Sequence, residues 1–119
     1  MATIIDSPQV LADKVDLQGV RVRRWANMAS GDVGSQVILT KYNDRTVHVT
    51  GTFGGATVLF EGSNDGVEFL PMRDPYNAVV STTSAKLIYL TEVPLYVRPR
   101  VSGGTGVSVT VIFCGVGRE

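Results

Sequence analysis

The amino-acid sequence predicts an all-β fold, an antiparallel β-sandwich or jelly roll with an extended N-terminal arm. The 119 residues include 19 valines, 11 threonines and 13 glycines, a composition typical of strands joined by tight turns. Roughly seven to nine short alternating runs follow one another about every ten residues, and no useful length of chain has helical periodicity. Each run is taken in chain order below.

The length suits a single domain with one modest core. We divide it into an arm, residues 1–19, and a β-sandwich domain, residues 20–119. The arm carries three aspartates and few positions that fit a strand pattern. It is either a loose terminal tail or an ordered arm that packs against a neighbouring subunit through Ile4, Ile5, Val10 and Leu11.

The first strand of the domain is expected at Val20–Arg23, with two arginines on one face, running towards Trp25. Arg24 interrupts the alternation, so a bulge or strand end is expected there. The apolar run within residues 36–42 fits a strand buried on both faces or a short covered segment. Residues 46–53 alternate cleanly, with Val47 and Val49 on one face and His48 among threonines on the other.

The most recognisable stretch is residues 51–72. Two reversals, at Gly54-Gly55 and at Asn64-Asp65-Gly66, separate three apolar runs. Asparagine and aspartate tolerate a left-handed φ and glycine accepts it freely, so both sites suit tight turns. The sequence therefore predicts three antiparallel strands in succession, the last resuming at Val67–Leu70.

The C-terminal third predicts one further strand and a hairpin. Residues 86–91 alternate, and residues 95–102 and 107–114 alternate on either side of a glycine-rich reversal at 103–106. Pro99 has no backbone donor, so its strand is expected to be an edge or to contain a bulge. Residues 73–77 form a loop between these parts.

The sequence offers no catalytic constellation, and we expect neither an enzyme nor a bound cofactor or metal. His48 and Cys114 are the only histidine and cysteine. We interpret His48 as a surface strand residue and Cys114 as a small apolar residue of the core or of an interface. Zinc needs grouped cysteine and histidine, and the acidic residues around the turn at 64–66 lack the longer ligand loop of calcium sites.

Charge and targeting signals narrow the function further. Eleven basic and eleven acidic residues balance, which disfavours nucleic-acid binding because such proteins carry a basic excess. No apolar run approaches the roughly 20 residues that span a bilayer, and no signal peptide is evident. A lone cysteine suits a reducing compartment or stability gained through assembly. We expect synthesis in a cytoplasm.

The arginines admit two interpretations. Arg21, Arg23 and Arg24 lie near one end of the domain, and Arg98, Arg100 and Arg118 near the other. If the first and last strands are neighbours, these residues share a positive face. That face is an ordinary solvated surface that protects strand edges by charge, or it docks an acidic protein partner through bidentate contacts. Nucleic acid is a third and weaker alternative, because few aromatic residues lie among the arginines.

Residues 47–75, 87–106 and 107–113 together resemble the capsid decoration (cement) proteins of tailed phages, small virion proteins. The resemblance covers the last three quarters of the chain and rests on turn-and-strand motifs. It implies a β-sandwich or jelly-roll unit, often a homo-trimer, that clamps adjacent major capsid subunits from outside the shell. No motif fixes the docking partner, which leaves tail, baseplate or head-fibre roles open.

The hairpin at residues 59–72 also resembles that of discoidin-like domains, which bind carbohydrate through loops. Tyr76 and Trp25 are the only obvious aromatic candidates for such a loop. The sequence as a whole favours a structural virion protein on the capsid exterior, with the major capsid protein as partner. Residues expected to contact that partner are Ile4, Ile5, Val10, Leu11, Arg21, Arg23 and Trp25.

Overall fold

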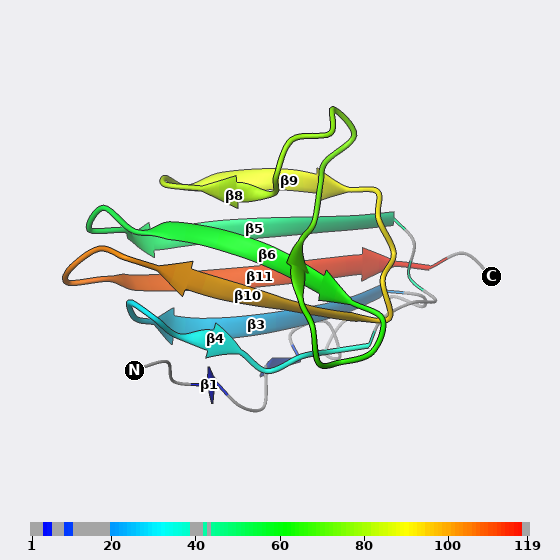
Figure 1. Cartoon of the computed structure of the whole chain (residues 1–119), viewed down its shortest axis with the longest axis horizontal. Coiled ribbons are helices and arrows are strands. Elements are labelled where there is room, and N and C mark those ends of the chain that lie inside the picture. The colour runs from blue at the N-terminus through cyan, green and yellow to red at the C-terminus, as the bar shows by residue number, and fades with distance from the viewer. Residues whose placement is uncertain (1–3, 6–8, 11–19, 39–41, 43, 118–119) are drawn as a thin grey trace.

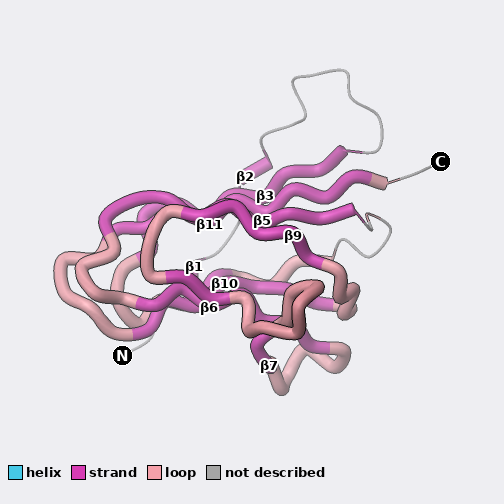
Figure 2. Tube along the Cα trace, turned by 90° about the horizontal axis from the view of Figure 1, so that it is seen from above, coloured by secondary structure: helices cyan, strands magenta, loops and turns pink. Residues whose placement is uncertain are grey.

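The computed structural model describes residues 4–5, 9–10, 20–38, 42 and 44–117. It confirms the all-β fold: two sheets pack face to face, as the two layers of Figure 2 show. Every regular element in the described ranges is a strand, so none of these residues belongs to a helix that could span a membrane.

Each sheet has two arm-derived residues at one edge. Sheet A has the order β1 (Ile4–Ile5), β4 (Val33–Gly34), β10 (Tyr96–Ser102), β6 (Thr57–Ser63), with β7 (Leu70–Pro71) and β8 (Ser81–Thr82) both paired to β6. Sheet B has the order β2 (Gln9–Val10), β3 (Val20–Met28), β11 (Ser108–Val116), β5 (Asp44–Thr52), β9 (Lys86–Leu90). Neighbours run antiparallel except β1 and β4, which are parallel.

Four connections at one end of the molecule cross between the sheets. They join β3 to β4, β5 to β6, β8 to β9, and β10 to β11, at the left of Figure 1. The strands of each pair therefore belong to opposite layers instead of forming a hairpin. Together with the crossover from β9 to β10, this wrapped strand order is a jelly roll, one of the two predicted arrangements.

The crossing connections correct two expectations. The reversals at Gly54-Gly55 and at 103–106 lie where the sequence predicts, but they are arches between sheets, so 46–53 and 57–61 are not successive strands of one sheet. The arches touch: the Thr105 N–H donates to the Gly54 carbonyl at 3.0 Å. Gly54 has φ 56°, and a Cβ there would lie 1.9 Å from the Thr105 oxygen, so only glycine fits.

The predicted turn after β6 is present, but the strand that follows is shorter than expected. Gly66 has φ 75°, and Asp65 Oδ1 accepts hydrogen bonds from Ser63 Oγ and from the N–H groups of Val67 and Glu68. The N–H groups of residues 67 and 68 therefore bond within the turn and do not pair with β6. Pairing with β6 consequently resumes only at Leu70, opposite Gly62.

The alternation of apolar residues places the core between the sheets. Val47 and Val49 of β5 are buried, as are Val97 and Val101 of β10, and His48 is exposed. Trp25 is fully buried, with its ring centroid 6.2 Å from that of Phe60 in an edge-on arrangement. The predicted inner faces of these strands are confirmed.

Two local irregularities lie elsewhere than the sequence suggests. Pro99 is in the interior of sheet A, not at an edge: Val97 and Val101 bond to Val37 and Asp32 on one side, and the missing donor falls between them, where the neighbouring strand β4 has only two residues. The bulge in β3 follows Trp25, where Asn27 has φ 57°, and Arg24 pairs regularly with Ile112.

Candidate interaction surfaces

Within the described residues, no group of histidine, cysteine, aspartate or glutamate could hold a metal ion. His48 projects from the outer face of sheet B, opposite Ile112 and Leu87 on the neighbouring strands. Cys114 shares that face and is half-buried rather than part of the core, and burial raises the pKa of its thiol. A thiol held protonated in this way is a weak nucleophile.

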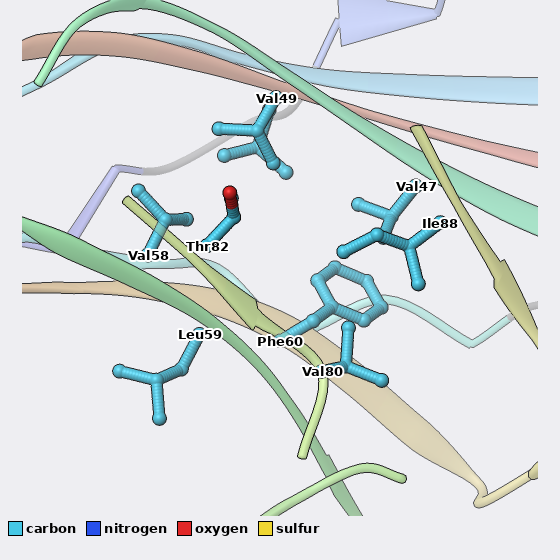
Figure 3. Close-up of a pocket in the computed structure, with 9 residues that line it drawn as sticks. Val47, Val49, Val58, Leu59, Phe60, Val80, Thr82 and Ile88 are labelled. Atoms are coloured by element: carbon cyan, nitrogen blue, oxygen red, sulfur yellow. The ribbon is translucent and has the colours of Figure 1, made fainter. Parts of the chain in front are cut away.

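A void of about 10 Å³ lies between the sheets and is lined mainly by apolar side chains of β5, β6 and β9. Figure 3 shows Val49, Val58 and Phe60 pointing into it from opposite layers. That volume is about the minimum for one water molecule, so this void cannot hold a larger ligand.

The arm residues expected to contact a partner lie against the protein's own sheets where they are described. Ile4 and Ile5 form β1, paired with Val33 and Gly34, and Val10 belongs to β2, paired with Arg23. Leu11 lies outside the described residues. Packing of the arm against a neighbouring subunit stays a prediction.

Of the remaining predicted contact residues, two are accessible and one is not. Arg21 is exposed and Arg23 is half-buried, and both share the face of β3 that carries Trp25. Trp25 itself has no exposed surface, and its Nε1 donates to the Ser35 carbonyl at 3.1 Å. The large apolar ring is used by the core, so Trp25 is corrected from a contact residue, and from a loop aromatic, to a core residue.

The arginines of the two ends do not share one face. Arg21, Arg23 and Arg24 are on β3 in sheet B, whereas Arg98 and Arg100 are on β10 in sheet A. The first and last strands are neighbours as supposed, but β10 is in the other layer because the 103–106 connection is an arch. Arg118 lies outside the described residues.

On sheet A, Arg98 and Arg100 are held by one buried carboxylate. Glu61 is 3% exposed; its Oε1 accepts from Arg98 Nε at 3.2 Å and its Oε2 from Arg100 Nε at 2.8 Å. The Arg98 guanidinium carbon also lies 3.8 Å from the centre of the Phe69 ring. Two cations share one anion, so this cluster keeps a net positive charge with a fixed geometry.

The exposed apolar side chains gather in one part of the chain. Of the ten large apolar residues that are exposed in the described ranges, eight lie between Val67 and Leu95. Four of them line a groove of about 640 Å³ between the 73–79 loop, β8 and β9. We call these four residues the apolar edge: Tyr76, Val79, Leu87 and Tyr89.

The apolar edge is built on an open strand. β9 pairs with β5 on one side. No described strand pairs with its other side, which we call the free edge of sheet B. Ile88 and Leu90 point into the core, so Leu87 and Tyr89 point outwards, with 66% and 50% of their surface exposed. In Figure 1 the 73–79 loop rises beside β9 at the top of the molecule.

Hydrogen bonds fix the loop that walls the groove. Asp74 Oδ1 accepts from the N–H groups of Tyr76 and Ala78, and Arg73 Nη1 donates to the Asn77 carbonyl at 2.8 Å. Tyr76 at the loop tip is 90% exposed. The loop is therefore held in shape while its aromatic ring stands in water.

A second groove lies beside β7. Leu70, Pro71, Val93 and Pro94 line a groove of about 470 Å³ that also contains Glu92 and Asn64. Asn64 Oδ1 accepts from the Leu95 N–H at 2.9 Å, and Arg45 Nη1 donates to the Glu92 carbonyl. These bonds tie the segment between β9 and β10 to the rest of the molecule.

The sequence reasoning missed the apolar edge. The pattern of residues 86–91 placed Leu87 and Tyr89 on one face and Ile88 and Leu90 on the other, and both faces read as apolar. A strand that is apolar on both faces while standing at a sheet edge is the signal of an exposed surface. This signal can be recognised only once β9 is known to be an edge strand, and the sequence alone does not show its position in the sheet.

Comparison with solved structures shows a protein of similar fold. No protein-family model matches the chain, and no curated protein matches it by sequence. Among solved structures, the crystal structure of the SPBc2 prophage-derived protein YomS is similar, with a TM-score of 0.61 over 87% of this chain and 99% of that one. The two share 15% sequence identity, so the likeness is one of fold. The chain is thus a jelly-roll protein with a prophage-derived structural neighbour.

Proposed function

We propose that the chain is a structural component of a phage particle, a capsid decoration protein that binds across adjacent major capsid subunits and stabilises the shell. The observation that carries this proposal is the gathering of exposed apolar side chains on β9 and the 73–79 loop. Monomeric proteins rarely keep such patches unless they bind another macromolecule.

Two further facts support an assembly role in a phage. The similar fold of YomS, a prophage-derived protein, connects this architecture to phages. The described residues also offer a solid core and outward-facing surfaces rather than a ligand cavity. A protein with several modest contact surfaces binds a repetitive shell well, because each contact raises the effective concentration of the next.

The proposal assigns parts to the surfaces. The arm and the arginines of β3 contact the major capsid protein, and copies associate with one another. No step of chemistry, cofactor, nucleic acid or membrane enters this role. The site of action is the outside of the capsid.

Immunogold electron microscopy of purified particles tests this role. Label distributed over the whole shell is expected for a decoration protein. Label confined to one vertex or to the tail would move the chain to a tail, baseplate or head-fibre role. Particles that carry no label at all would contradict a virion protein of either kind.

One observation favours a second candidate function, carbohydrate binding. Tyr76 stands almost fully exposed beside Asp74, and Tyr89 lines the same groove. Aromatic rings next to a polar group are the usual components of a sugar-binding surface. A glycan array probed with the chain and with Tyr76→Ala tests it: binding that the variant loses would support this function, and an empty array would reject it.

A further inference from the structure

The free edge of β9 has the properties of a surface that binds its own copy. We propose that β9 pairs antiparallel with β9 of a second copy of this chain, about a two-fold axis at Ile88, so that sheet B becomes continuous across two molecules. The inference rests on the geometry of the apolar edge and not on the proposed role in a virion.

The first argument is the condition of the edge strand. Natural proteins protect free edges with proline, bulges, several charges or a covering segment. β9 pairs with β5 in regular register over all five residues, from Lys86 opposite Val49 to Leu90 opposite Arg45. Its only charged residue is Lys86, at its beginning. An unprotected regular edge accepts an added strand.

The second argument is self-complementarity. In an antiparallel pair centred on Ile88, Leu87 of each copy lies directly opposite Tyr89 of the other. Both side chains are on the exposed face and would form two aromatic–aliphatic cross-strand pairs, which stabilise sheets by roughly 0.2–1 kcal/mol each in general. A two-fold contact needs a surface that matches itself in this way.

The third argument concerns space and charge. The groove of about 640 Å³ runs beside β9 with the 73–79 loop as its other wall, where an added strand would lie. The groove carries one acidic and one basic side chain, Asp74 and Lys86. Two copies therefore meet with balanced charge, whereas an acidic or a basic partner would find no excess of the opposite sign.

A register-specific disulfide tests the proposal. Directly opposed residues of antiparallel strands have Cα atoms about 4.5–5.5 Å apart, within the range that a disulfide spans. Leu87→Cys and Tyr89→Cys are prepared separately, each with Cys114→Ser to remove the natural thiol. An equimolar mixture under mild oxidation is expected to give a covalent dimer that joins position 87 to position 89.

The matched controls are the two variants oxidised alone, in which equal positions lie two residues out of register. Each should give several-fold less dimer than the mixture. Equal yields in all three samples, or no dimer in the mixture, would overturn the two-fold pairing.

Light scattering gives an independent measurement without oxidation. The double variant Leu87→Asp, Tyr89→Asp places two charges on the contact and should halve the mass of the natural assembly, whereas Val116→Asp, at an exposed position outside the edge, should leave it unchanged. Circular dichroism of the double variant verifies that it is folded. A natural chain that stays at 12.8 kDa at about 100 µM would overturn the proposal and leave the edge to another protein.

Discussion

At the residue scale, a few polar side chains form hydrogen bonds and ion pairs that the alternation of apolar residues does not predict. Glu61 sits under Arg98 and Arg100 on the outer face of sheet A, Asp65 organises the turn after β6, and Arg45 is buried with its Nε donating to the Tyr42 carbonyl. Each of them forms hydrogen bonds with backbone or charged groups: Glu61 between two paired strands, and Asp65 and Arg45 next to a strand end. Their removal should have specific and measurable effects.

Replacing Glu61 with glutamine should destabilise the fold by about 1–3 kcal/mol, because two arginines lose their shared anion while the volume is kept. The estimate stays moderate because the Arg98 and Arg100 side chains keep 26% and 42% of their surface in water. Urea unfolding at pH 7 measures the loss. Glu68→Gln, at an exposed acid nearby, is the control, and equal midpoints for both variants would contradict the role given to Glu61.

Asp65 should make stability depend on acid pH. The N–H groups of Val67 and Glu68 and the Ser63 hydroxyl hold the pKa of this carboxyl below its ordinary value of 3.8. The unfolded state therefore takes up its proton first, so the stabilisation is complete above that value and is lost as the pH falls through the lowered pKa. We expect Asp65→Asn to lower the melting temperature at pH 7.

The difference in melting temperature between the natural chain and Asp65→Asn should then shrink as the pH falls from about 4 through the lowered pKa, below which the natural carboxyl is also neutral. Thermal unfolding followed by circular dichroism at several pH values measures both curves. A difference that stays constant from pH 7 to pH 2 would mean that the charge of Asp65 has no part in the turn.

At the scale of elements, the arches decide the topology. Gly54 and Gly104 let two connections come into contact: a Cβ on Gly54 would meet the Thr105 carbonyl, and one on Gly104 would lie 2.7 Å from the Ala56 nitrogen. The neighbouring Gly55 and Gly103 also have positive φ, but a Cβ would have open space at both. Within each arch, one glycine therefore allows the close contact, and its neighbour provides only the positive φ.

Gly54→Ala should destabilise the protein by at least about 2 kcal/mol, because it adds a backbone clash to the cost of a left-handed φ. Gly55→Ala is the matched control: it has the φ cost alone and should lose roughly 1 kcal/mol. Chemical denaturation of the pair measures the difference. Equal losses would show that the contact between the arches adds nothing.

The sequence predicts the strands of this fold better than their partners. Alternation identified the inner faces of β5, β10 and β11, because burial of valine and phenylalanine leaves a period of two. The same alternation arises whether Val47 and Val58 share one sheet or face each other across the core, so an arch and a hairpin look alike. Which sheet a strand joins is a tertiary property, and this is why the arginines of β3 and β10 were placed on one face.

The candidate sites follow the same rule. The arm residues could be named from their position and apolar character, but Trp25 could not be assigned to the core until the face of β3 was known. The apolar edge was invisible because Leu87 and Tyr89 become a surface only when β9 is the last strand of its sheet. The sequence shows which residues of a strand share a face. Which of these faces form a docking surface depends on how the strands are arranged in the two sheets.

At the scale of the whole molecule, the two edges of the sandwich differ. One edge carries the short arm strands β1 and β2, and the other carries β9 and the 73–79 loop with its groove. A jelly roll with different opposite edges can contact a shell protein through one and its own copies through the other. The proposed decoration role requires both contacts, one with the shell protein and one between copies.

Deleting residues 1–19 should separate the two contacts. The remaining domain keeps the core and the apolar edge, so it should stay folded and keep its self-association, while its binding to capsids is abolished. Sedimentation with shells and light scattering of the same preparation measure the two properties. A truncated chain that binds capsids with full affinity would contradict the role of the arm.

The most direct test of the central claim is to measure, by co-sedimentation over a range of concentrations, how the purified chain of residues 1–119 binds to undecorated phage shells. The account predicts saturable binding with a fixed number of copies per shell, and shells that resist heat better once they are saturated. A chain that remains in the supernatant at every concentration, beside shells of unchanged stability, would contradict it.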